Sequence, residues 1–104
     1  MLRLGLSLIM LSGCTMIDMH TPPPSDWPKL EMVYVKSRAE VYDCGTAVAC
    51  ANVNFDTMKC TIYIAADDPE SAALGREHEE AHCAGRDHIG STAFRDYWEA
   101  WKAR

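Results

Sequence analysis

Residues 76–88 read REHEEAHCAGRDH and hold three of the four histidines in the 104-residue chain. His78 and His82 stand four residues apart, so on a helix both imidazoles lie on one face and can reach one point. Glu79 follows His78 and projects about 100° around the helix from it. A solvated, charged helix with histidines on its surface is the alternative, but the spacing favours a metal site.

The residues after this helix extend the pattern. Gly85 allows the sharp turn that ends a helix, and His88 follows three residues later, where a third imidazole can return to the metal. Zinc binds imidazole nitrogen at about 2.0–2.1 Å and prefers four ligands in a tetrahedron, so three histidines leave one position for water. From its place beside His78, Glu79 can accept a proton from that water without binding the ion.

The complete string, HExxHxxGxxH, resembles the signature of the metzincin class of zinc endopeptidases. The resemblance implies one Zn²⁺ per chain with His78, His82 and His88 as ligands, Glu79 as general base and Gly85 as the turn residue. It covers eleven residues and the strand-then-helix order before them, not a whole domain. Metzincins carry a methionine turn downstream of the third histidine, whereas all six methionines of this chain precede His88.

A second resemblance includes the elements that precede the helix. Small bacterial lipoproteins that are zinc metallopeptidases share a Cys-Gly element and a Cys-initiated strand, and here Cys44-Gly45 and Cys60-Thr61-Ile62-Tyr63 are similar to them. This resemblance implies a zincin-like domain that hydrolyses a peptide or amide bond. The alternative is a non-catalytic zinc-binding envelope lipoprotein with a structural or interaction role.

The first fourteen residues, MLRLGLSLIMLSGC, are typical of an export signal, 1–13, followed by a modified cysteine. Arg3 is followed by an apolar stretch, Leu4 to Leu11, that is too short to span a bilayer. Leu11-Ser12-Gly13-Cys14 resembles the lipobox of bacterial lipoproteins, which implies cleavage before Cys14 and its acylation, for example with palmitate. An ordinary signal peptide is the alternative. In a Gram-negative host, Thr15 would favour the periplasmic face of the outer membrane.

Composition limits the partners. The chain is long enough for one small domain. Its formal net charge of -5 and the absence of a long basic run argue against a nucleic-acid partner. We therefore expect a cell-envelope protein that is held on the lipid bilayer through Cys14 and acts on a peptide or an envelope protein.

Residues 14–29 contain four prolines and no apolar periodicity. Pro22–Pro24 favour an extended polyproline conformation, which predicts a tether. His20 lies in this segment, far along the chain from the other histidines, and is expected to be solvated. The predicted folded domain is then residues 30–104.

Four cysteines besides Cys14 fit an exported domain whose core is small. They allow three disulfide pairings, of which we favour Cys44–Cys50 and Cys60–Cys83, since the second would join a strand to the histidine helix. In an alternative interpretation Cys83 is a metal ligand. On a helix, however, it projects about 100° away from its neighbour His82.

The remaining pattern predicts an α+β fold in which a small antiparallel sheet packs on the zinc-binding helix and a C-terminal helix. Residues 31–35 favour a strand, and residues 50–64 favour a hairpin with Cys60, Ile62 and Ile64 on one face. Residues 39–45 fit either a strand or a short helix.

Capping residues and aromatic spacing place the two helices. Asp68 is a good N-cap and Pro69 suits the first helical position. Residues 92–103 predict a second helix with Ser91 as its cap. Four aromatic residues at helical spacing predict its core-facing side: Phe94, Tyr97, Trp98 and Trp101.

Further roles near the site are less specific. By analogy with other zinc peptidases, residues 60–64 are a candidate edge strand for substrate pairing. Tyr63 and Tyr97 are candidates for stabilising an oxyanion, although packing is the favoured role of Tyr97. Glu80 and Asp87 are expected to be solvated or to orient a ligand imidazole, and Arg86 to be a surface charge.

Overall fold

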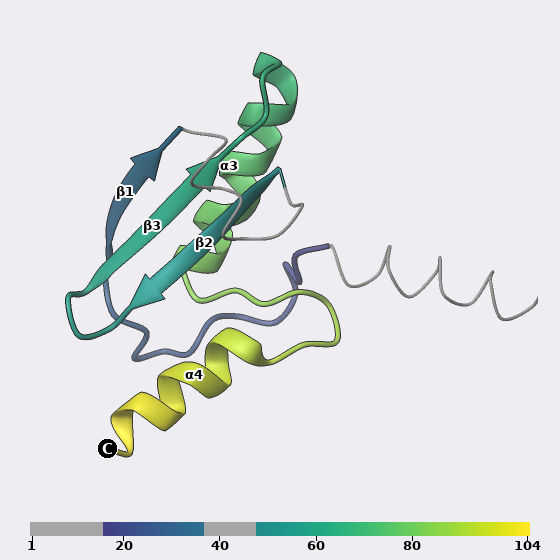
Figure 1. Cartoon of the computed structure of the whole chain (residues 1–104). Coiled ribbons are helices and arrows are strands. Elements are labelled where there is room, and N and C mark those ends of the chain that lie inside the picture. Colours follow the sequence, from purple (N-terminus) through teal and green to yellow (C-terminus); the bar gives the residue numbers. More distant parts are fainter. Residues whose placement is uncertain (1–15, 37–47) are drawn as a thin grey trace, which may run out of the picture.

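The computed structural model describes residues 16–36 and 48–104. Its three strands form one sheet in the order β1-β3-β2, and helix α3 packs against β2 and β3 (Figure 1). Helix α4 lies near the β2–β3 turn, where its aromatic side chains contact Phe55. The elements are β1 Glu31–Val35, β2 Ala49–Asn54, β3 Lys59–Ile64, α3 Pro69–Cys83 and α4 Ala93–Lys102. The predicted α+β class is confirmed.

The predicted hairpin is present, with β2 and β3 antiparallel from Ala49↔Ile64 to Asn54↔Lys59. Strand β1, however, pairs with β3 in parallel, so the prediction of an antiparallel sheet was wrong and the sheet is mixed. The physical reason is that a hairpin turn determines the direction of only its own two strands. The residue alternation in β1 marks a strand but does not encode the direction of its neighbour.

The core lies between the sheet and the helices. Cys60, Ile62 and Ile64 are buried on one face of β3, as predicted. Phe55, 1% exposed, follows β2, and its ring centroid lies 5.3 Å from that of Trp27 and 4.9 Å from that of Trp98. These aromatic contacts join the β2–β3 turn, helix α4 and the N-terminal segment into one apolar cluster.

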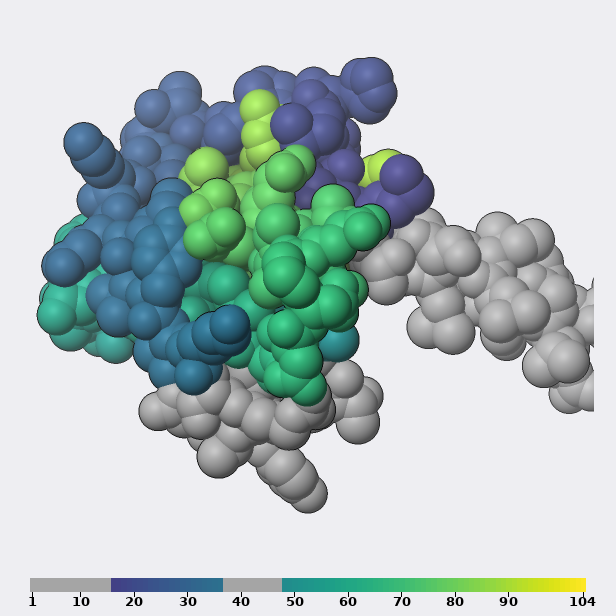
Figure 2. All heavy atoms as spheres, turned by 90° about the horizontal axis from the view of Figure 1, so that it is seen from above, coloured from purple at the N-terminus to yellow at the C-terminus, as the bar shows by residue number. Residues whose placement is uncertain are grey.

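Residues 16–29, which precede the predicted start of the domain at residue 30, make contacts with it. Trp27 Nε1 donates a hydrogen bond to the Cys83 carbonyl (2.9 Å), and Trp98 Nε1 donates to Asp26 (3.1 Å). Figure 2 shows this segment, in purple, lying against the loop that follows α3. Residues 16–29 contain no helix or strand, and the apolar surface of Trp27 holds their backbone on the domain.

One predicted disulfide is present and joins the sheet to the histidine helix. Cys60 in β3 is bonded to Cys83, the last residue of α3, with Cα atoms 5.7 Å apart. This bond excludes Cys83 as a metal ligand. Cys50 is also disulfide-bonded, and its predicted partner Cys44 lies outside the described residues. So do Cys14, the predicted signal 1–13 and the ambiguous segment 39–45.

Helix α3 begins and ends where the capping residues predicted. The Asp68 side chain accepts a hydrogen bond from Ser71 N at 2.8 Å, and Gly85 has a left-handed φ of 93° after the last turn. Gly75 gives a close approach to the sheet, since a Cβ there would lie 3.1 Å from Ala49 Cβ. No helix in the described part of the chain is long and apolar enough to cross a membrane.

Helix α4 has the predicted position but a different cap. Its N-cap is Thr92, and Ser91 Oγ accepts a hydrogen bond only from Ala93 N, at 3.3 Å. The carboxylate of Asp87 instead accepts from Phe94 N (2.7 Å) and Arg95 N (3.3 Å). A side chain from the preceding loop therefore caps the helix, a role that neighbouring residues in the sequence do not reveal.

Candidate metal centre

Three histidines converge at the end of helix α3. The Nε2 atom of His88 lies 3.0 Å from Nε2 of His78 and 3.1 Å from Nε2 of His82. One ring nitrogen from each residue lies within 4.8 Å of the others. Zinc–nitrogen bonds of about 2.0–2.1 Å place two ligands of a tetrahedron about 3.3 Å apart. The three side chains are therefore close enough together to bind one metal ion.

Two elements bring these side chains together. Helix α3 presents His78 and His82 one turn apart, and the helix ends two residues before Gly85. The left-handed backbone at Gly85 reverses the chain, so that His88 returns to the helix face. The predicted return of the third imidazole is thus present in the structure.

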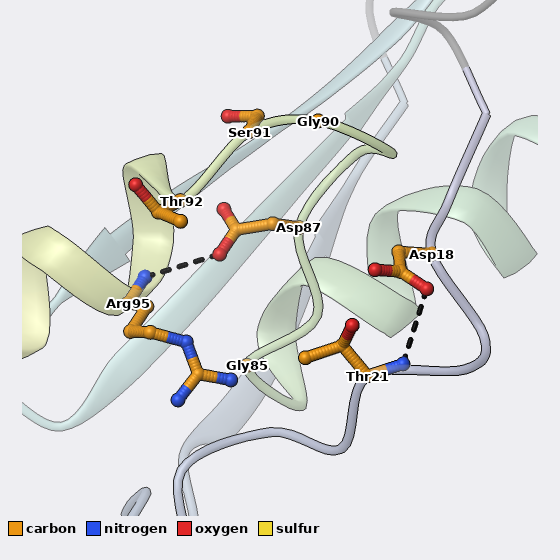
Figure 3. Close-up of a pocket in the computed structure, with 8 residues that line it drawn as sticks. All are labelled: Asp18, Thr21, Gly85, Asp87, Gly90, Ser91, Thr92 and Arg95. Carbon is orange, nitrogen blue, oxygen red and sulfur yellow. Dashed lines mark hydrogen bonds between the residues drawn. The ribbon is translucent and has the colours of Figure 1, made fainter.

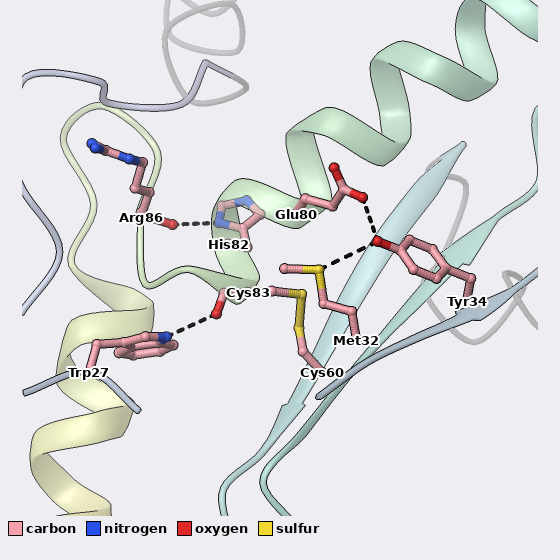
Figure 4. Close-up of a disulfide and its surroundings, with 8 residues drawn as sticks. All are labelled: Trp27, Met32, Tyr34, Cys60, Glu80, His82, Cys83 and Arg86. Carbon is pink, nitrogen blue, oxygen red and sulfur yellow. Dashed lines mark hydrogen bonds between the residues drawn. A yellow bond between two sulfur atoms is a disulfide. The ribbon is translucent and has the colours of Figure 1, made fainter. Parts of the chain in front are cut away.

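The ring of His82 has a defined orientation. Its Nδ1 lies 2.7 Å from the carbonyl oxygen of Arg86 (Figure 4). A carbonyl oxygen only accepts hydrogen bonds, so Nδ1 carries the proton and donates it, and Nε2 presents its lone pair to the other histidines. Sequence analysis assigned Arg86 to the surface as a charge and did not identify this role of its backbone.

Burial favours the neutral form of two of the imidazoles, those of His78 and His82. His82 is 3% exposed, and burial lowers its pKa to about 4. The pKa of His78 is also lowered, by burial first and then by the proximity of His88. Because a metal binds the neutral form of imidazole, the donor set fits a divalent cation.

Glu79 lies in the same cavity as the three histidines. It is 7% exposed, and burial raises its pKa to about 7 because low-dielectric surroundings disfavour the charged carboxylate. The cavity, of about 350 Å³, lies between α3, β2 and the first turn of α4. Its lining residues are Ala49, Cys50, Ala51, His78, Glu79, His82, His88 and Phe94.

A second hollow continues from the metal centre along the same side of the sheet. It has a volume of about 460 Å³ and shares Ala49, His78 and Glu79 with the first cavity. Val48 and Leu74, which are 58% and 62% exposed, give it an apolar lining. Together the two hollows form a groove between α3 and β2, which we call the α3–β2 groove.

The structure changes the assignment of the edge strand. Residues 60–64 belong to β3, which is paired on both sides, so they cannot pair with an added strand as predicted. Strands β1 and β2 are the two edges of the sheet within the described residues, and β2 is the edge that lines the α3–β2 groove. The hairpin pattern did not show which of its strands would lie at the edge.

The two tyrosines proposed for the oxyanion line another hollow beside β2, which shares Cys50, Ala51 and Phe94 with the cavity of the three histidines. Neither Tyr63 nor Tyr97 is among the residues that line the cavity of the three histidines. The ring of Tyr97 lies 4.9 Å from that of Phe55, which agrees with the favoured packing role.

Three charged residues near the histidines have partners elsewhere. Glu80 accepts a hydrogen bond from the Tyr34 hydroxyl of β1 (Figure 4), and Asp87 caps α4. Arg86 Nη1 donates to the carbonyl oxygens of Asp18 (3.4 Å) and Thr21 (3.2 Å), so its prediction as a plain surface charge was wrong. Such partners are distant in sequence, and no local pattern identifies them.

The chain matches no family model, no curated protein and no solved structure. The geometry of the site and the sequence motif are therefore the grounds for a function.

Proposed function

We propose that this protein is a membrane-anchored, zinc-dependent metallopeptidase that hydrolyses a peptide or amide bond. The observation that carries the proposal is the convergence of His78, His82 and His88 beside the buried carboxylate of Glu79. A structural zinc site encloses the ion with four protein ligands, whereas a catalytic site uses three and leaves one position for water or substrate. Within the described residues, the group of possible ligands has three members.

Zinc is the ion that suits this donor set best. Imidazole nitrogen suits zinc, copper, iron and nickel. Zinc alone among these has no redox chemistry, and its filled d shell imposes no geometry, so it accepts a tetrahedral site. Bound here, zinc would supply a Lewis acid that lowers the pKa of water toward 7 and polarises the substrate carbonyl. The hydrogen bond from His82 to the Arg86 carbonyl would hold that ring in its binding orientation.

Glu79 has the position for proton transfer. It neighbours a ligand in sequence, lines the cavity of the histidines and is not one of the three metal-binding side chains. In the proposed reaction its carboxylate accepts a proton from the attacking water as the oxygen bonds to the carbonyl carbon. The carbon–nitrogen bond then breaks, and Glu79 gives the proton to the departing nitrogen.

The α3–β2 groove supports an extended peptide as substrate. The β2 edge offers backbone groups to which an extended chain can pair. The groove continues from Glu79 to the exposed apolar side chains of Val48 and Leu74. We therefore expect a substrate with an apolar residue close to the scissile bond.

The resemblance of Leu11–Cys14 to a lipobox supports the membrane anchor. Cys14 lies three positions before Ile17 in the sequence, and an extended chain spans at most about 11 Å over three residue steps. Because Ile17 pairs with His88, an acylated Cys14 would hold the metal centre close to the membrane surface. The natural substrate would then be a peptide or protein of the cell envelope.

A single experiment tests the proposal. The purified chain is loaded with zinc and incubated with a library of peptides, and the same sample is assayed after chelation and after zinc is restored. We expect one zinc per chain and cleavage only in the loaded and restored samples. Zinc binding without cleavage of any peptide would favour a non-catalytic zinc-binding envelope lipoprotein. Failure to bind zinc at micromolar metal would contradict both functions.

A further inference from the structure

We propose that residues 16–21 and the side chain of Arg86 form a clamp that positions the third ligand, His88. This inference rests on the proposed metal site and adds the N-terminal segment to it. It concerns a positioning role, because no residue of the clamp is among the three possible metal ligands.

The backbone on both sides of His88 is bound to the clamp. Ile17 lies opposite His88 in an antiparallel β-bridge. Asp18 N donates to the Asp87 carbonyl (2.9 Å), and Ile89 N donates to the Met16 carbonyl (2.9 Å). Two hydrogen bonds therefore hold the peptide groups before and after the ligand, which restricts the rotation of its backbone.

Arg86 connects the clamp to a second ligand. Its guanidinium donates to the carbonyl oxygens of Asp18 and Thr21, while its own carbonyl accepts from His82 Nδ1. The Asp18 carboxylate also accepts from His20 N (2.9 Å) and Thr21 N (3.1 Å). These bonds fold the segment into a turn whose carbonyl groups face Arg86.

The loop that carries His88 needs an external support. It contains two glycines with left-handed backbones, Gly85 (φ 93°) and Gly90 (φ 82°), and Ile89 is 47% exposed. Figure 3 shows the clamp residues Asp18 and Thr21 facing this loop and the start of α4 across a polar cavity of about 340 Å³. Backbone hydrogen bonds to Met16 and Asp18, rather than apolar packing of Ile89, hold the loop in place.

A preorganised ligand binds a metal more tightly because less conformational entropy is lost on binding. Outer-shell partners that orient ligands typically change metal affinity by about 10- to 100-fold. We therefore expect loss of the clamp to weaken zinc binding within that range while the disulfide-linked domain stays folded.

The test compares variants of the complete purified chain by competition with a chromophoric zinc chelator. Asp18→Pro removes the N–H that donates to Asp87, whereas Asp18→Ala keeps this donor and removes only the carboxylate. We expect zinc affinity to fall at least about 10-fold more in Asp18→Pro than in Asp18→Ala. Arg86→Ala is expected to show a similar loss of zinc affinity. If Asp18→Pro does not fold, this variant alone tests whether the clamp positions His88.

A second measurement separates positioning from general stability. At saturating cobalt, a displaced His88 changes the d–d absorption of the bound ion, whereas a merely less stable fold does not. Lys102→Ala is the matched control, because it removes the ion pair of α4 with Asp26, leaves the hydrogen bond from Trp98 to Asp26 in place and does not touch the clamp. It should retain the zinc affinity and cobalt spectrum of the parent chain.

Two results would overturn the inference. One is parental zinc affinity and cobalt absorption in both Asp18→Pro and Arg86→Ala. The other is an equal loss of zinc affinity in Lys102→Ala, which would show that residues 16–21 stabilise the whole fold and do not position His88 specifically. In both cases the parent chain still binds zinc and the proposed function stands, whereas a parent chain that binds no zinc removes the function as well.

Discussion

The ring of Phe94 lies against the ring of His82, with centroids 4.5 Å apart and 22° between the planes. The edge of the same imidazole donates to the Arg86 carbonyl. His82 is therefore held on its face by α4 and on its edge by the loop after α3. The arrangement of the three histidines is thus a product of tertiary packing as well as of the spacing within one helix.

The first prediction concerns the ligands. His88→Ala should weaken zinc binding by more than about 100-fold, beyond the range typical of outer-shell changes, because it removes one of three nitrogen donors. Isothermal titration with zinc measures the affinity. His20→Ala is the control, because it removes an exposed imidazole outside the group of possible ligands and keeps the backbone N–H that His20 contributes to the clamp. Similar affinities for the two variants would contradict the three-histidine site.

The second prediction concerns the proton-transfer residue. Glu79→Gln should retain zinc binding and lose about 10²- to 10⁴-fold in kcat, since the amide cannot accept the proton of the attacking water. The peptide identified in the library assay serves as substrate. Glu77→Gln, an exposed position two residues earlier on α3, should keep parental activity. Equal rates for Glu79→Gln and the parent chain would remove Glu79 from the mechanism.

The third prediction concerns the α3–β2 groove. Leu74→Asp places a charge on the apolar lining and should lower kcat/KM about 10-fold or more for a substrate with an apolar residue over that position. Leu74→Met, which conserves volume and apolar character, should change kcat/KM little. Steady-state kinetics with a matched pair of peptides, one apolar and one acidic at that residue, measures the effect. An unchanged preference in Leu74→Asp would show that the substrate does not occupy this part of the groove.

Features with a local cause were predictable from the sequence. The four-residue spacing of His78 and His82 defines a helix face, and Gly85 marks the end of that helix because few other residues adopt its backbone conformation. Alternation in residues 59–64 gave the buried face of β3. The Cys60–Cys83 pairing was predicted correctly, because a small core gains stability from a bond that joins a strand to the histidine helix.

Features that depend on distant partners could not be predicted in this way. The direction of β1, the edge position of β2 and the packing of Trp27 on the domain depend on how the chain returns through space. Asp87 was expected to be solvated or to orient a ligand imidazole. Its carboxylate instead accepts from backbone N–H groups of α4, and no side chain in the sequence marks those donors. Proline content likewise predicted a tether at residues 14–29, but it carries no information about the surface on which Trp27 packs.

The fourth prediction concerns the disulfide. Replacing Cys60 and Cys83 together with alanine should lower the free energy of unfolding by about 3 kcal/mol, because the bond closes a loop of 23 residues in the unfolded chain. Urea denaturation followed by tryptophan fluorescence measures the change, with chelator present so that metal does not contribute. A midpoint equal to that of the parent chain would show that this crosslink does not stabilise the domain.

The fifth prediction tests which side chain caps α4. Asp87→Ala should lower the free energy of unfolding by about 1 kcal/mol, because it removes the acceptor of the Phe94 and Arg95 N–H groups. Ser91→Ala should cost less, since Ser91 accepts one longer hydrogen bond from Ala93 N. Urea denaturation of the metal-free variants measures both. If Ser91→Ala were the more costly change, the cap predicted from the sequence would be correct. Asp87 would then have no part in holding α4 in place, or in holding Phe94 of that helix against His82.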